Sequence, residues 1–315
     1  MKKFISILLI ALLCATALTG CKKEQVAVNV AALMGPTGMG IVGLMEDEYA
    51  GKYNVSISSA PDDITSAFIS GSLDIAAVPI NVASVLYNRL EGDVVMLCVN
   101  TLGVLYVLES GDSVNTIADL AGKTIYATGQ GATPEYVLNA LLEKNGLADQ
   151  VQVEYKSEHS ELATLLASGM VELGMLPEPN VTAVLAQNPD IRIALDLTAQ
   201  WNDVSETTLV QGCVIARREF VTENADTIAK FLEDYAASVQ FVNEDAEAAA
   251  QLMETHGIMP KAALAQKAIP NANIVCWTGE QMRVAAADML QVLFDANPKS
   301  VGGALPGANL YYEAR

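Results

Sequence analysis

The sequence predicts an α/β protein of two similar lobes, in which strands and helices alternate along the chain. The first observation is an internal repeat: segment 68–86 recurs at 166–185, with glycine, proline and asparagine residues in matching positions. The second is that each half reads strand–helix–strand–helix–strand–helix, which indicates parallel sheets covered by helices. The third is composition, because 315 residues with 51% hydrophobic and 17% charged residues fit two domains with sizeable cores.

The repeated segment carries the same local signals in both halves. A Ser-Gly pair at 70–71, and again at 168–169, is predicted to end a helix, because glycine readily adopts the left-handed cap conformation. The apolar runs that follow, 73–78 and 171–176, predict strands buried on both faces. A proline ends each strand, and a new helix is expected one or two residues later.

Each repeat extends upstream into two further strands. In the first half a β-rich run begins at Val26, a glycine loop follows, and 53–58 is the next strand. Asp62 and Asp63 are expected to cap a helix over 64–70. The equivalent strand, glycine loop and strand of the second half are 124–128, 129–134 and 151–155.

The chain is expected to cross twice between the lobes. The direction changes at 101–103, between strands predicted at 94–100 and 103–108, and the return falls near Gln211 and Gly212. Apolar stripes at helical spacing predict core-facing helices in the remainder. The expected first lobe therefore comprises 26–102 and 212–315, and the second 103–211.

The N-terminus has the features of an export signal. Two lysines precede an apolar stretch over 4–17, which is too short for an ordinary membrane span. The segment Leu18–Cys21 resembles the lipobox of bacterial lipoproteins, which implies cleavage after residue 20 and a lipid on Cys21. Residues 1–20 are therefore predicted to be removed, 21–25 to form a tether, and the protein to be exported and lipid-anchored.

The net charge argues against some classes of partner, and the cysteines are few. Without residues 1–20 the chain has 16 basic and 37 acidic residues, a balance of −21, which disfavours nucleic acid and anionic lipid surfaces. Cys98, Cys213 and Cys276 remain besides Cys21. They are interpreted as free thiols, two of them in buried strands, with a single disulfide left open.

Several of these features together resemble one family. The segment Asp119–Lys123 before a strand, the duplicated Ser-Gly…Pro stretches, the lipobox and the loop-rich tail over 297–312 resemble type II periplasmic-binding proteins. The tail is similar to that of binding proteins for taurine, alkanesulfonate, nitrate and thiamine precursors. The resemblance implies a two-lobed, Venus-flytrap fold, each lobe a parallel-type sheet with an antiparallel strand and helices on both faces. It also implies a monomer without a cofactor that closes on a small molecule and delivers it to an ABC permease and its ATPase.

The expected ligand site lies where the carboxyl ends of the strands face one another. Glycine loops let backbone N–H groups approach a ligand closely, and the N-termini of the helices that follow favour a negatively charged ligand. An acid at position 178 suits a ligand amine or is a helix-start carboxylate, and a tryptophan at 201 suits a flat ligand or packs between the lobes. The expected contacts are Thr37, Gly38, Met39, Asn81, Thr101, Gln130, Gly131, Ala132, Thr133, Glu178, Asn180, Trp201 and Gln211.

Other functions fit the sequence less well. His159 and His256 lie far apart in the chain, and no nucleophile, zinc or P-loop motif is present, so neither catalysis nor a metal site is expected. A pyrimidine-making enzyme shares the fold, but its cysteine-rich run is missing here. LysR-type regulators share the lobes but lack an export signal, whereas a lipid-anchored sensor stays open. The ligand class also stays open: a sulfonate, carboxylate, nitrate or pyrimidine-like ring.

Overall fold

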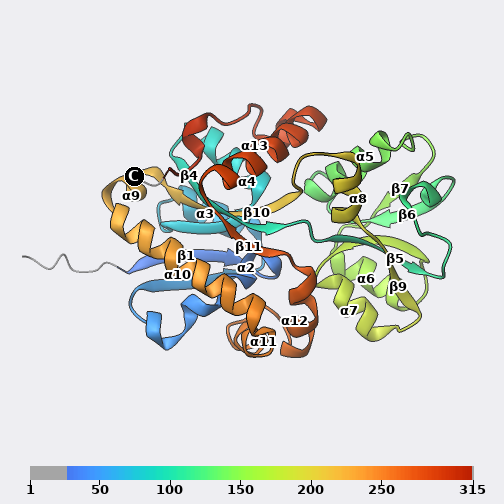
Figure 1. Cartoon of the computed structure of the whole chain (residues 1–315), viewed down its shortest axis with the longest axis horizontal. Helices are drawn as coiled ribbons and strands as arrows, with labels where there is room; N and C mark the ends of the chain where they lie inside the picture. The colour runs from blue at the N-terminus through green and yellow to red at the C-terminus, as the bar shows by residue number, and fades with distance from the viewer. Residues whose placement is uncertain (1–26, 314–315) are drawn as a thin grey trace, which may run out of the picture.

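The computed structural model describes residues 27–313 and contains two mixed β-sheets, each covered by helices (Figure 1). The predicted signal segment, Cys21 and the tether lie outside the described residues. The first sheet has the order β11-β4-β10-β3-β1-β2. Its strands are β1 (Val28–Leu33), β2 (Tyr53–Ser58), β3 (Ile75–Pro79), β4 (Val94–Leu102), β10 (Val210–Arg217) and β11 (Ile274–Trp277).

The second sheet has the order β7-β6-β8-β5-β9. Its strands are β5 (Leu105–Ser110), β6 (Thr124–Ala127), β7 (Gln152–Tyr155), β8 (Leu173–Pro177) and β9 (Ile191–Asp196). In both sheets the strands of the repeat pair in parallel, and a strand that comes from beyond a crossover inserts antiparallel beside β3 or β8. The chain passes between the sheets from β4 to β5 and from β9 to β10.

Helices cover both faces of the first sheet. One face packs against α3 (Pro61–Ile69), α4 (Ile80–Arg89) and α13 (Gly279–Ala296), and the other against α10 (Ala225–Glu244), α11 (Ala246–Thr255) and the 3-10 turn η1 (Val42–Met45). Residues along β1 alternate between these two cores. The remaining helices and turns of this part are α2 (Pro36–Met39), η2 (Asp47–Tyr49), α9 (Arg218–Glu223), α12 (Ala262–Ala268), η4 (Ile269–Asn271), η5 (Pro298–Val301) and η6 (Ala308–Leu310).

The second sheet is covered by α5 (Thr133–Lys144) and α8 (Leu197–Val204) on one side and by α6 (His159–Ala167) and α7 (Asn180–Gln187) on the other, with η3 (Ile117–Leu120) before β6. Helices that cover the first sheet also contact helices that cover the second: α13 contacts α5, and α12 contacts α7. Among residues 27–313, no helix combines the length and the apolar character needed to cross a membrane.

The duplicated helix ends confirm the glycine signal. Gly71 and Gly169 have φ angles of 80° and 72°. The residue after each glycine donates its N–H to a carbonyl five residues back, at 3.0 Å and 2.9 Å, which satisfies groups that the helix end leaves unpaired. The buried strands begin two residues later than predicted, at Ile75 and Leu173.

The structure corrects the predicted start of the second helix of the first half. The helix predicted at 64–70 begins at Pro61, and neither Asp62 nor Asp63 caps it. Proline suits the first helical position because its missing N–H has no helical partner there, and the two acids lie in the first turn near the positive end of the helix dipole.

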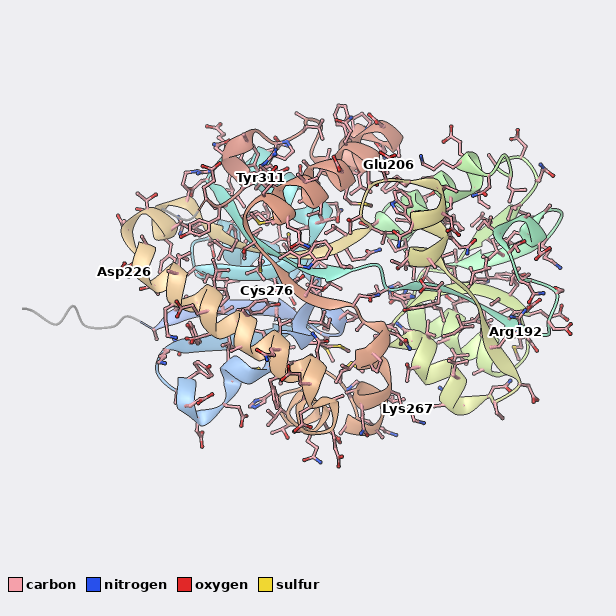
Figure 2. All side chains as sticks on the ribbon, in the orientation of Figure 1. Arg192, Glu206, Asp226, Lys267, Cys276 and Tyr311 are labelled. Atoms are coloured by element: carbon pink, nitrogen blue, oxygen red, sulfur yellow. The ribbon has the colours of Figure 1, made fainter. Side chains whose placement is uncertain are left out.

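All three cysteines of the described chain are free thiols, with Cys276 half-buried on β11 (Figure 2).

Candidate functional site

A cavity of about 380 Å³ lies between the two sheets, at the ends of repeated strands. It is walled by the turn after β1, by the end of β3 and start of α4, by the start of α5, and by the end of β8 and start of α7. Because parallel strands end at the same edge of a sheet, residues far apart in the chain converge here. Eight of the predicted contact residues line the cavity: Thr37, Asn81, Thr101, Ala132, Thr133, Glu178, Asn180 and Gln211.

The other five predicted residues lie elsewhere. The backbone of Gly38 packs so closely that a Cβ would lie 2.1 Å from the Leu33 carbonyl oxygen, and Met39 is fully buried in the core beside it. Gln130 and Gly131 lie outside the cavity wall, and the Gly131 N–H donates to Glu135 Oε2 at 2.6 Å. This N–H is therefore engaged by a carboxylate in the first turn of α5.

Trp201 is a core residue of the second lobe. Its side chain is 0% exposed, and its indole Nε1 donates to the Thr207 carbonyl at 3.0 Å. The polar residues around it in the sequence suggested a surface loop, but they lie on the outer side of α8, whereas the indole faces inward. Trp201 therefore does not cover the ligand cavity.

Glu178 lines the cavity but already has its own hydrogen-bond partners. It is 1% exposed, and its carboxylate accepts from the Thr182 N–H at 3.1 Å, from the Thr182 hydroxyl at 3.0 Å and from Asn271 Nδ2 at 3.3 Å. Burial raises the pKa of this carboxyl, and the three hydrogen bonds oppose that shift. Glu178 is thus held in place by its neighbours and is not a free counter-charge.

Two buried polar groups on the cavity wall have no hydrogen-bond partner within residues 27–313. They are the hydroxyl Oγ1 of Thr133, which is 4% exposed, and the side-chain nitrogen Nε2 of Gln211. Thr133 is the first residue of α5, which covers the second sheet, and Gln211 lies on β10 of the first sheet, so the two groups come from different parts of the molecule. Because an unpaired buried polar group is costly, these two groups are the strongest indication of where a ligand binds.

His159 is a wall residue that the sequence reasoning missed. Its Nδ1 lies 2.6 Å from the Thr128 hydroxyl, and burial lowers its pKa, which favours the neutral ring. The repeat offered a signal that would have found it. At the offset of 98 residues, His159 corresponds to Pro61, and these are the first residues of α6 and α3 and both line the cavity.

The electrostatics of the cavity come mainly from the backbone. Six helices (α2, α3, α4, α5, α6 and α7) begin at the wall, and their N-terminal ends carry partial positive charge. In the part of the chain that the structure describes, no lysine or arginine lines the cavity. Nor does any group of three or more histidine, cysteine or acidic side chains between residues 27 and 313 fit a metal ion. The site therefore suits a ligand held by neutral donors and helix ends.

Comparison with known proteins identifies the family. The model of the NMT1/THI5-like family matches residues 54–249, which span most of the repeat. The chain belongs to the NMT1/THI5-like family. A comparison of this NMT1/THI5-like protein with curated proteins gave no match.

Solved structures share its fold. An ABC transporter structure from Parabacteroides distasonis is 23% identical, with a TM-score of 0.80 over 92% of this chain and 100% of the other. The periplasmic aliphatic sulphonate binding protein SsuA from Escherichia coli is 18% identical, with a TM-score of 0.73 over 92% and 93% of the two chains. The periplasmic nitrate-binding protein NrtA from Synechocystis is 12% identical, with a TM-score of 0.53 over 73% and 66%. These likenesses confirm the two-lobed fold of periplasmic binding proteins.

Proposed function

We propose that this NMT1/THI5-like protein is the extracytoplasmic solute-binding component of an ABC importer and has no catalytic activity of its own. Within this proposal, residues 26–102 with 212–315 and residues 103–211 are lobes that close on a small molecule as a monomer. A permease and its ATPase then receive that molecule. The observation that carries the proposal is the cavity between the sheets, where Thr133 and Gln211 contribute polar groups that have no partner among residues 27–313.

The wall chemistry supports a small ligand that accepts hydrogen bonds. Helix ends and neutral amides or hydroxyls bind sulfonate, carboxylate or nitrate oxygens, and they also bind the ring nitrogens of a pyrimidine. Mass spectrometry of small molecules released from the purified, denatured protein is the direct test. Recovery of one such compound at near-stoichiometric amount supports the proposal. A protein purified from its native source that releases no small molecule, and that no compound in a thermal-shift screen stabilises, contradicts it.

Thr133 gives the sharpest test of the site. The change Thr133→Val keeps the shape and removes the unpartnered hydroxyl, so we expect affinity for the released molecule to fall about tenfold, or about 1.4 kcal/mol. The ligand-free protein should be as stable as before or more stable, because a costly buried hydroxyl is lost. Isothermal titration and urea unfolding measure the two quantities.

Thr198→Val is the matched control. Thr198 also has a buried, unpartnered hydroxyl in the described chain, but it does not line the cavity. Its replacement should affect stability in the same direction and leave affinity unchanged. If both variants bind as tightly as the unmodified protein, the α5 terminus does not contact the ligand.

Anchoring through Cys21 is a separate part of the proposal. The motivation is the segment Leu18–Cys21 directly after the apolar stretch. Acyl chains give firm membrane attachment, because each buried CH₂ contributes about 0.8 kcal/mol. Cys21→Ala should leave the protein unprocessed or release it from the membrane fraction. Unchanged fractionation together with an unchanged intact mass would contradict lipidation.

A further inference from the structure

The segment from η4 to β11 links the two parts of the molecule. It follows α12, which packs against α7, and Lys267 marks the end of α12 in Figure 2. The Tyr106 hydroxyl on β5 donates to the Asn271 carbonyl at 2.9 Å, and Asn271 Nδ2 donates to Glu178 Oε1 at 3.3 Å. Asn273 Nδ2 donates to the carbonyl of Gly103, in the crossover, at 2.6 Å. A segment that leads into the first sheet is thus hydrogen-bonded to residues of the second sheet and of the crossover.

Glu178 is the acceptor in all of its side-chain hydrogen bonds. All three hydrogen bonds run toward the carboxylate, two from Thr182 and one from Asn271. A carboxylate accepts on both oxygens and so satisfies all three donors, and the residue is 1% exposed, so water does not replace a lost partner easily. Asn271 comes from the other side of the junction, so its bond breaks if the parts separate there.

We propose that Asn271, Glu178 and Tyr106 form an interlobe clamp that restrains the separation of the lobes before any ligand binds. The inference rests on the proposed two-lobed receptor and deepens it. Glu178 is the positioning residue of this clamp, because it lies on the cavity wall and acts on the lobes through Asn271. The same side chain thereby joins the binding surface to the contact between the lobes.

Reversing the polarity of the Glu178–Asn271 bond tests the clamp. Asn271→Asp places two carboxylates against each other, so this single change should weaken the contact, whereas Glu178→Gln alone is not used because the Asn271 amide can turn its oxygen toward the new N–H. The Glu178→Gln/Asn271→Asp double variant restores complementarity. Its new amide nitrogen donates to the new carboxylate, its amide oxygen still accepts the Thr182 N–H, and the Thr182 hydroxyl can turn to accept the second N–H of the amide.

Small-angle scattering of ligand-free protein is the measurement. A compact chain of this length has a radius of gyration of about 20 Å. The Asn271→Asp variant should exceed the value of the unmodified protein, and the double variant should return to it. Asn88→Asp is the matched control, because Asn88 Nδ2 donates to the Val301 and Ala304 carbonyls, all three from the first lobe. This control should leave the radius unchanged.

Tyr106→Phe keeps the test decisive if a charged variant fails to fold. It removes one bond of the clamp and should also expand the ligand-free protein, whereas Tyr87→Phe, which removes a contact to Asn309 on the first lobe, should not. Folded single variants that scatter like the unmodified protein overturn the clamp. So does a double variant that stays expanded. Because no ligand is used, these outcomes are independent of whether the proposed transport function is correct.

Discussion

Trp201→Ala should lower the free energy of unfolding by about 3–5 kcal/mol and leave the ligand affinity of the folded protein unchanged. The side chain is fully buried in the core that α8 shares with the second sheet, so its removal leaves a large cavity. The indole bond to the Thr207 carbonyl is lost as well. Urea unfolding followed by circular dichroism measures the loss, since fluorescence would change with the tryptophan itself.

Trp277 provides the control for this prediction. It is the other tryptophan of the chain, and it is only half-buried on β11. Trp277→Ala should therefore destabilise the protein by clearly less than Trp201→Ala. A Trp201→Ala protein of normal stability with tenfold weaker binding would instead place the indole at the ligand.

Gly103→Ala should destabilise the protein by about 3 kcal/mol, the upper end of the range for overpacking. A Cβ at this position would lie 2.1 Å from Thr198 Oγ1 and 2.8 Å from Leu209 Cδ2. Neither Gly103 nor Gly212 has a positive φ, so backbone geometry does not explain why glycine occurs at the two crossovers. Glycine is required there because neighbouring side chains pack too closely for a Cβ. The two crossovers at 101–103 and near Gly212 are also where we expect the chain to bend when the lobes close on a ligand.

The Gly103 prediction has an internal rescue. Gly103→Ala/Thr198→Ala removes the nearest clashing atom and should recover part of the loss, measured by urea unfolding. Gly307→Ala is the control, because Gly307 is exposed and a Cβ there meets only the ends of two flexible side chains, at 2.9 Å and 3.1 Å. If Gly103→Ala is as stable as the unmodified protein, the crossover is looser than the structure describes.

The expected ligand residues fall into two groups, those whose position follows from the strand topology and those whose position depends on helix packing. Positions just after repeated strands, such as Asn81, Thr133 and Asn180, could be placed from sequence because the topology of parallel strands brings their ends together. Trp201 and Met39 could not, since whether a side chain faces the cavity or the core depends on the rotation of its helix against the sheet. His159 has no local signal of a ligand site, and only its equivalence to Pro61 in the repeat indicates a place on the cavity wall.

The sequence by itself determined the repeat, the alternation of strands and helices, and the glycine-capped helix ends at Gly71 and Gly169. These features depend on local backbone preferences and on apolar patterning, which act over a few residues. The tertiary structure alone decided that Glu178 bonds to Asn271 and that Gly103 packs against Thr198. Contacts between residues about 90 positions apart depend on how two sheets and their helices are docked, and no local pattern in the chain specifies that docking.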